Sequence, residues 1–315
     1  MIKFFYMLTF ARRHYGSNRF YKIINILIYL EYLIVNKLCN FYVQNFYKKC
    51  KKSLNCDLRK EKIIVSCTSI PSRLNTLPIM LKSIFNQTMM PDKIILWITD
   101  EECATGNVER ILKTEIEQGL EIRYVRDLKV HTKYYYAMKE YCEDVIITID
   151  DDILYPENLI EELWYAHLAI PHAIISERAH AITFNNDKIN PYKLWHMLAP
   201  GYENDASTLI ATGVGGVLYP PKVLFKDWDN IKLFLDICPT ADDIWLKIME
   251  TLNGVNIHKI HLYTKENFII GNTQAIALSK QNVNGGRNDK LLDNCIRHYG
   301  ITSAMLGKNT SDCKG

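Results

Sequence analysis

Residues 144–156 read DVIITIDDDILYP, and this stretch decides the fold. Its first half, 145–149, is short, apolar and rich in β-branched residues. Such a run is typical of a strand that is buried on both faces of a sheet. The run ends abruptly in Asp150, Asp151 and Asp152, so we expect three carboxylates at the carboxyl end of a buried strand.

The sequence before this stretch alternates between strand-like and helix-like segments. Strands are predicted at 62–68, 93–99, 121–126 and 144–150, and helices at 75–86, 107–118 and 132–142. Alternating units of this length favour an α/β fold with a mostly parallel sheet and helices on both faces. Because ligands bind beyond the carboxyl ends of the strands in such sheets, the residues that follow each strand are the candidate site.

The composition excludes a disordered or fibrous protein, because 48% of the 315 residues are hydrophobic and only 14 are Gly and 10 Pro. The chain has room for one large domain or two small ones. Its nine cysteines are scattered and form no CxxC pair. This pattern favours a reducing compartment over a disulfide framework or a zinc site.

The net charge of +3 hides an asymmetry along the chain. Residues 1–60 hold 12 Lys and Arg against 2 Asp and Glu, whereas the rest of the chain holds 26 against 33. We therefore expect a helical basic arm over 1–60 and a separate catalytic body over 61–315.

The arm contains an apolar run, 20–35, that is interrupted by Lys22, Asn25 and Glu31. The run is shorter than the roughly 20 clean residues that cross a bilayer, and no cleavage site follows it. Basic residues interleaved with Phe and Tyr favour an anionic membrane surface as the partner of the arm. An arm that packs on the body or on a second subunit, and a true span, are the alternatives; nothing later in the chain supports nucleic-acid binding. The basic residues are Arg12, Arg13, Arg19, Lys37, Lys48, Lys49, Lys51 and Lys52.

Polar residues follow the first two predicted strands. Thr68, Ser69 and Arg73 come after the first, and Asp100 comes after the second. Hydroxyls and a guanidinium at a strand end suit a nucleotide or a phosphate. The alternatives are a capped turn at the first strand and an ordinary acidic helix start at the second.

The three consecutive carboxylates after residue 149 would repel one another, because like charges held together raise each other's pKa. A divalent cation offsets this repulsion, and hard oxygen ligands favour Mg²⁺ or Mn²⁺. The alternative is a cluster that caps the helix expected to begin near Pro156, although one Asp would suffice for that.

Several motifs carry a resemblance to a known family. The segment TIDDDILYP resembles the DXD motif of GT-A fold glycosyltransferases, and the chain from 61 to about 300 resembles family-2-like bacterial transferases that build surface polysaccharides. The other matching motifs are SIPSR (69–73), Gln87-Thr88 with Pro91, Thr132-Lys133, TGVGGVLYPP (212–221), TADDIWL (240–246) and NGGRND (284–289).

The resemblance implies a metal-dependent, inverting hexosyltransferase that moves a sugar from a nucleotide-sugar donor to a glycan or lipid-linked acceptor. It divides the body into a nucleotide-binding half, 61–152, and an acceptor-binding half, 153–315. The charge split of the arm, with no clean span and no cleavage site, predicts a cytoplasmic enzyme at the inner face of the cell membrane, where the lipid-linked acceptors that the resemblance implies would lie.

The same resemblance implies a role for each candidate residue. Asp152 and Asp150 would hold the metal, and Asp243 would be the general base, with Asp242 as second choice. The alternative for this acidic pair is that it complements the N-terminal end of a helix. The donor-binding residues would be Thr68, Ser69, Arg73, Asp100, Lys133, Asp150, Asp151, Gly215 and Gly216.

Other interpretations stay open at this point. A nucleotidyl- or phosphotransferase could use a similar metal site, but it should carry a Gly-rich phosphate loop, and SIPSR has no glycine. A non-catalytic, membrane-anchored assembly subunit should tolerate loss of the acidic residues. No motif decides whether His258 or His261 binds metal, and Trp195 with His196 would either line the acceptor site or pack as a lid.

Overall fold

The computed structural model describes residues 1–10, 19–47, 54–55, 58–99, 107–199, 206–260, 266–271 and 286–307, with side chains described from residue 22 onward in the second helix. Asp100, one of the predicted donor-binding residues, lies outside these ranges, as do His261, Arg12, Arg13 and the lysines at 48–52.

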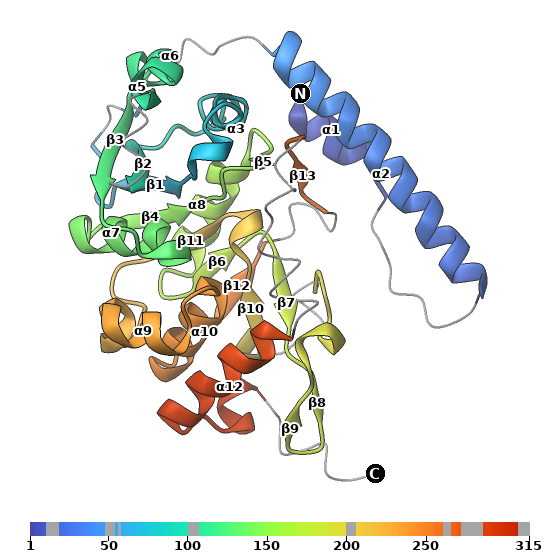
Figure 1. Ribbon diagram of the computed structural model, residues 1–315, viewed down its shortest axis with the longest axis vertical. Helices are drawn as coiled ribbons and strands as arrows, with labels where there is room; N and C mark the ends of the chain where they lie inside the picture. The colour runs from blue at the N-terminus through green and yellow to red at the C-terminus, as the bar shows by residue number, and fades with distance from the viewer. Residues whose placement is uncertain are drawn as a thin grey trace.

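A seven-stranded sheet forms the centre of the molecule, in the order β12-β6-β11-β4-β1-β2-β3 (Figure 1). All neighbouring strands pair in parallel except β11, which is antiparallel to both β4 and β6. This arrangement confirms the predicted α/β class with a mostly parallel sheet. The strands are β1 (Ile63–Thr68), β2 (Lys93–Thr99), β3 (Leu120–Val125), β4 (Val145–Thr148), β6 (Ile174–Ser176), β11 (Val217–Tyr219) and β12 (Ile257–Lys259).

Helices cover both faces of this sheet, which explains why the central strands read as continuous apolar runs. Ile63, Val65 and Cys67 of β1 point into one core, together with side chains of α3 (Leu77–Ile84) and α8 (Leu159–Ala169). Ile64 points into a second core on the opposite face. The helices of that second core are α7 (Thr132–Glu140), α9 (Ile231–Ile237), α10 (Asp242–Leu252) and α12 (Arg287–Tyr299).

The predicted helix at 107–118 is two shorter helices instead of one. α5 (Val108–Ile111) and α6 (Lys113–Glu117) are separated at Leu112, whose backbone leaves the helical region at φ −100° and ψ 16°. The Leu112 side chain is nonetheless fully buried. Its apolar spacing therefore fits a helix pattern even though the backbone is interrupted there.

Three two-stranded antiparallel ribbons stand outside the main sheet and were not predicted. The ribbon of β5 (Ile153–Leu154) and β13 (Phe268–Ile269) lies directly after the acidic stretch. The other two pair β7 (Ala179–Ala181) with β10 (Leu209–Ala211), and β8 (Phe184–Asn185) with β9 (Lys188–Ile189). A strand of two or three residues is too short to show a period in sequence.

The N-terminal segment is helical, as predicted, and it packs on the body. α1 (Ile2–Leu8) buries Ile2 and Tyr6 completely, and both join the core of α3 and α8. α2 (Arg19–Asn45) has 27 residues and is much longer than its apolar run at 20–35. Between Lys22 and Asn45 this helix is long and apolar enough to cross a membrane by length and composition alone, and 28% of an apolar 18-residue window within it is buried inside the protein. The division of the chain at residue 60 stays a prediction.

Candidate active site

The acidic stretch forms a tight turn at the carboxyl end of β4. The backbone N–H of Asp150 donates to the hydroxyl of the fully buried Tyr155 at 2.8 Å. Asp151 and Asp152 are both buried. None of the three caps the following helix, because α8 begins at Leu159 with Asn158 as its N-cap. The cap alternative therefore does not explain the cluster.

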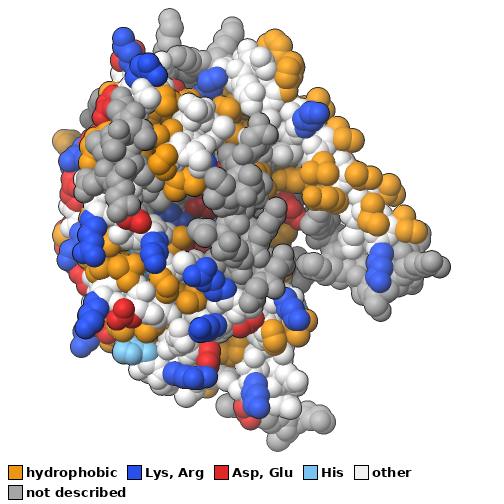
Figure 2. Space-filling view, viewed as in Figure 1, with side chains coloured by type: hydrophobic (Ala, Val, Ile, Leu, Met, Phe, Trp, Pro, Cys, Tyr) orange, Lys and Arg blue, Asp and Glu red, His pale blue; other side chains and the backbone are white. Residues whose placement is uncertain are grey.

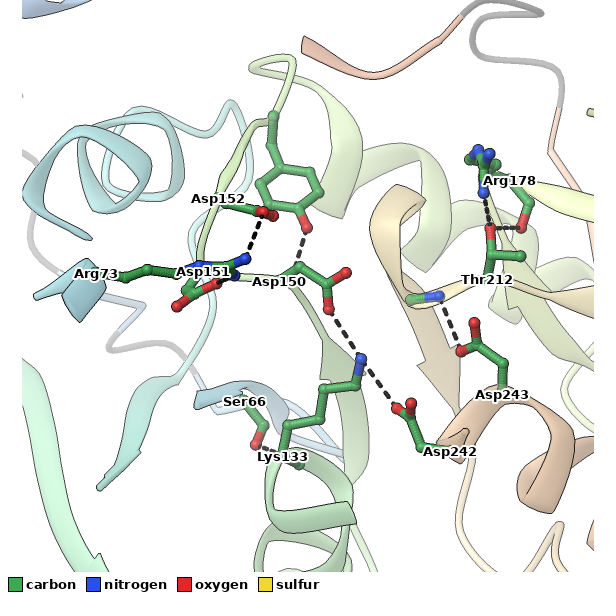
Figure 3. A network of polar contacts seen from close by, with 12 residues as sticks. Ser66, Arg73, Lys133, Asp150, Asp151, Asp152, Arg178, Thr212, Asp242 and Asp243 are labelled. Atoms are coloured by element: carbon green, nitrogen blue, oxygen red, sulfur yellow. Dashed lines mark hydrogen bonds and ion pairs between the residues drawn. The ribbon is translucent and has the colours of Figure 1, made fainter. Parts of the chain in front are cut away.

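The loop after β1 turns toward these carboxylates, as Figure 3 shows for Arg73. Its guanidinium lies 2.6 Å from an Asp151 oxygen and 3.3 Å from an Asp152 oxygen. The Ser69 hydroxyl donates to the other Asp151 oxygen at 2.6 Å. The sequence-predicted residues of two strand ends thus meet at one edge of the sheet.

Arg73 compensates only part of the negative charge. Burial, and then the charge of Asp150, raises the pKa of Asp152 to about 7 despite the nearby guanidinium. Burial also raises the pKa of Asp151, although Arg73 and Ser69 act to lower it. The turn therefore still favours a further positive charge.

Lys133 joins this turn to a second acidic element. Its ammonium lies 2.8 Å from Asp150 and 3.0 Å from Asp242 at the start of α10 (Figure 3). Burial opposes its charge, but Asp150 and Asp242 together raise the pKa of Lys133 well above its usual value. The Ser66 hydroxyl of β1 donates to the backbone carbonyl of Lys133, which fixes the first turn of α7 against the sheet.

The two acids that open α10 have different environments. Asp242 pairs with Lys133, whereas an Asp243 oxygen accepts a 3.1 Å hydrogen bond from the backbone N–H of Gly213. Burial, and then the charge of Asp242, raises the pKa of Asp243 to about 7. Both acids lie in the first turn of α10, as the helix-end alternative expects, and their contacts with Lys133 and Gly213 come in addition.

A glycine-containing turn, η5 (Gly213–Gly215), lies between Lys133 and Arg178. A Cβ on Gly213 would come within 2.5 Å of the Lys133 amine, and one on Gly215 within 2.5 Å of the Arg178 Cβ. Gly216 follows with φ +88°, a conformation that side chains disfavour. Crowding by neighbouring side chains therefore explains why glycine is needed at 213 and 215, and the backbone conformation explains it at 216. The predicted approach of Gly215 and Gly216 to the donor stays a prediction.

Three charged residues at the same edge were missed by the sequence analysis. Glu177 and Arg178 follow β6, and Lys259 ends β12, both of which run parallel to β4. Arg178 donates to the Thr212 hydroxyl at 2.7 Å, and burial raises the pKa of Glu177 to about 7. A signal was present in sequence for Glu177 and Arg178, which follow a short apolar run, but β6 has only three residues. Lys259 had no such signal, because β12 reads Ile257-His258-Lys259.

The chemistry of these side chains suits a divalent cation, and Asp150 and Asp152 as its ligands stay a prediction. Of the residues that the structure describes, no group of three or more His, Cys, Asp and Glu side chains could hold a metal by itself. Mg²⁺ and Mn²⁺ sites often use one or two carboxylates and take their remaining ligands from water and substrate phosphates. Five carboxylates gather here, and among the described residues Lys133 and Arg73 form ion pairs with them, so the excess charge is of the sign that a cation would compensate. They are Asp150, Asp151, Asp152, Asp242 and Asp243.

The remaining sequence candidates lie in varied surroundings. The Thr68 hydroxyl donates to the backbone carbonyl of Trp97 at 2.9 Å, so it is engaged within the sheet. Trp195 is buried and its indole N–H donates to the carbonyl of Asn190 at 2.8 Å, which supports the packing alternative. His196 makes a backbone bridge with Ala181, and His258 is an exposed residue of β12.

Comparison with known proteins gives structural neighbours alone. No family model and no curated protein matches the chain. Among solved structures, it is similar to the mannosyltransferase PcManGT from Pyrobaculum calidifontis in complex with GDP-Man and Mn²⁺, at 12% identity and a TM-score of 0.42, over 91% of this chain and 87% of that one. It is also similar to a CMP:2-keto-3-deoxy-manno-octonic acid synthetase complexed with CTP, at 10% identity and a TM-score of 0.38, over 66% of this chain and 91% of that one.

Proposed function

We propose that this chain is a glycosyltransferase that uses a nucleotide-sugar donor, a divalent cation and a glycan or lipid-linked acceptor in surface polysaccharide synthesis. One observation carries the proposal. The acidic turn after β4 lies next to the acidic start of α10, and Lys133 contacts both. Sugar transfer from a nucleotide needs these two functions side by side, because one end must hold a diphosphate and the other must accept a proton.

On the donor side, Asp152 and Asp150 would hold Mn²⁺ or Mg²⁺. When bound, the cation would stabilise the negative charge of the departing nucleoside diphosphate. Arg73 forms ion pairs with Asp151 and Asp152, and these contacts would hold the acidic turn in place. Lys133, whose ammonium lies 2.8 Å from Asp150, would turn that ammonium toward the diphosphate.

On the acceptor side, Asp243 would take the proton of the attacking hydroxyl. A general base works best when its pKa lies near the working pH, and burial raises the pKa of Asp243 to about 7. Asp242 is instead paired with the Lys133 ammonium at 3.0 Å. The structure thus supports the same choice within the pair as the sequence, and attack assisted by such a base inverts the sugar.

The test is to incubate the purified full chain with a panel of nucleotide sugars, candidate acceptors and Mn²⁺, and to measure released nucleoside diphosphate. We expect Asp243→Asn to reduce turnover by roughly 10²–10⁴-fold, because a positioned base contributes that much, while donor binding is kept. Asp236→Asn, an exposed acid on α9, is the matched control and should be fully active.

Three outcomes would contradict the proposal or part of it. Release of pyrophosphate from a nucleoside triphosphate would show a nucleotidyltransferase. Donor binding without turnover in every combination would favour a non-catalytic assembly subunit. Loss of turnover in Asp242→Asn but not in Asp243→Asn would show that Asp242, and not Asp243, is the general base.

A further inference from the structure

One face of α2 carries a continuous apolar stripe that nothing in the described protein covers. Its residues recur every three or four positions, so they lie along one side of the helix. The outward stripe consists of Ile23, Leu27, Leu30, Ile34, Leu38 and Phe41. Each of them is 50–62% exposed. Figure 2 shows apolar side chains gathered along this helix, which extends away from the body.

The opposite face of α2 is fastened to the body by apolar and polar contacts. Val35, Cys39 and Val43 are buried in the core. The Tyr32 hydroxyl donates to the carbonyl of Asn267 at 2.9 Å, and the Asn40 amide donates to the carbonyl of Ile269 at 2.9 Å. A helix that crossed a bilayer would have to give up these buried hydrogen bonds, which is costly. The helix is therefore suited to lie on a membrane surface instead of spanning it.

The charges around the stripe are complementary to anionic lipid. Lys22 and Lys37 are exposed on α2. The single acid of this helix, Glu31, is partly buried, and its carboxylate accepts a hydrogen bond from the backbone N–H of Phe10 at 3.3 Å. No acidic side chain is therefore exposed on the described part of α2. Two copies of this face would bring lysines together, whereas a negative surface would attract them.

We propose that α2 lies in the plane of an anionic membrane surface, with the outward stripe among the lipids and the opposite face packed on the body. An amphipathic helix of this kind binds through buried apolar area together with attraction between lysines and anionic headgroups. The stripe extends about 27 Å along the helix axis, at 1.5 Å per residue from Ile23 to Phe41. The surface goes beyond the proposed reaction, since it concerns where the enzyme works, at the inner face of the cell membrane.

The experiment is flotation of the purified full chain with vesicles of phosphatidylcholine alone or with 30% phosphatidylglycerol. The test variant combines Leu30→Glu with Ile34→Glu, on the stripe. The control combines Leu168→Glu with Leu194→Glu, which are 53% and 56% exposed on the body. Equal thermal midpoints of the three proteins establish that both variants fold.

We expect the native chain and the control to float with the anionic vesicles, and the stripe variant to bind at least ten-fold less. Added salt should weaken binding without abolishing it. Charge attraction is screened over about 8 Å at physiological ionic strength, whereas the apolar contact of the stripe with lipid is not.

Flotation of the stripe variant at the native level would overturn the proposal. So would a native dimer that the stripe variant turns into a monomer without lipid binding, since the stripe would then cover a second copy. Resistance of the native chain to alkaline carbonate extraction from cell membranes would show a span. Binding is measured without turnover, so these outcomes are independent of the transferase assay.

Discussion

At the residue scale, the site depends on how burial and charge divide five carboxylates into distinct roles. Asp242 is paired with Lys133, and Asp151 is paired with Arg73. Asp152 and Asp243 are the two whose pKa is raised to about 7, chiefly by burial. A raised pKa favours uptake of a further positive charge, and we propose a cation for Asp152 and a proton for Asp243. This division follows from geometry and is not visible in the sequence.

A prediction at this scale concerns the cation. We expect Asp152→Asn to weaken Mn²⁺ binding by at least ten-fold, because the substitution removes one of two carboxylates that would hold the ion. Isothermal titration of Mn²⁺ into the full chain, with donor nucleotide present, measures this directly. Asp236→Asn is again the control, and turnover of the native chain should be lost in EDTA. Unchanged Mn²⁺ affinity in Asp152→Asn, or turnover that survives EDTA, would remove the ion from the mechanism.

The candidate site was predictable from sequence to the extent that its residues follow long strands. Strands β1 and β4 are themselves clear apolar runs, and the residues that follow them were found for that reason. These residues are Ser69, Arg73, Asp150 and Asp152. Glu177 was missed because β6 has only three residues. The pairing of Lys133 with Asp242 is a contact between segments more than 100 residues apart, which no local pattern encodes.

At the element scale, the N-terminal helices reach the active site through a short ribbon. The Tyr6 hydroxyl donates to the carbonyl of Leu154 and accepts from the backbone N–H of Phe268, so α1 connects β5 with β13. The backbone N–H of Ile270 in turn donates to the carbonyl of Asp152 at 2.8 Å. These helices were expected as an arm, because a sequence pattern reveals that a helix is amphipathic but not which surface it meets.

We expect Asn40→Ala to loosen this ribbon. The Asn40 side chain donates to the carbonyl of Ile269 and accepts from the backbone N–H of Gly271 at 3.1 Å, so it holds both sides of the strand end. Loss of these two bonds, at about 1 kcal/mol each, should increase amide exchange at Ile270 and Gly271 by roughly thirty-fold. Hydrogen exchange read by NMR or mass spectrometry measures this. Asn45→Ala is the matched control, because the Asn45 amide bonds only to Phe41 within its own helix.

If the ribbon positions Asp152, the Asn40 variant should also lose turnover more than it loses thermal stability. Equal amide exchange in Asn40→Ala and Asn45→Ala would mean that the ribbon is held by its other contacts. In that case the N-terminal helices would have no part in ordering the site.

At the scale of the whole molecule, the sheet and its two cores followed from the sequence, because strands buried on both faces read as uninterrupted apolar runs. The direction of β11 did not, since it depends on a turn at Gly213–Gly215 that is packed between Lys133 and Arg178. This antiparallel strand brings the turn to the acidic edge of the sheet. The packing of this turn against the acidic edge of the sheet brings several carboxylates together in a buried site. Their ionisation therefore affects the stability of the entire fold.

The pH dependence of stability is the prediction that belongs to this scale. Burial raises the pKa of Asp152, Glu177 and Asp243 to about 7, whereas each titrates near 4 when the chain is unfolded. Between pH 4 and 7 the folded state therefore keeps protons that the unfolded state has released. These three carboxyl groups therefore make the free energy of unfolding fall as pH rises through this window. Burial lowers the pKa of His131 to about 4 and that of His180 to about 3, which opposes the fall, but three acids outweigh two histidines. We expect Tm, measured by calorimetry without ligand, to be lower at pH 8 than at pH 5 by at least the 2–4 °C that corresponds to about 1 kcal/mol.

Mn²⁺ with donor nucleotide should reverse this trend, because a bound cation stabilises the ionised carboxylates and is worth most at pH 8. Asp152→Asn should flatten the pH profile and abolish the gain from Mn²⁺, while Asp236→Asn should leave both unchanged. A Tm that rises from pH 5 to pH 8 in the native chain would contradict the argument, since the buried acids would then be ionised and compensated within the protein itself.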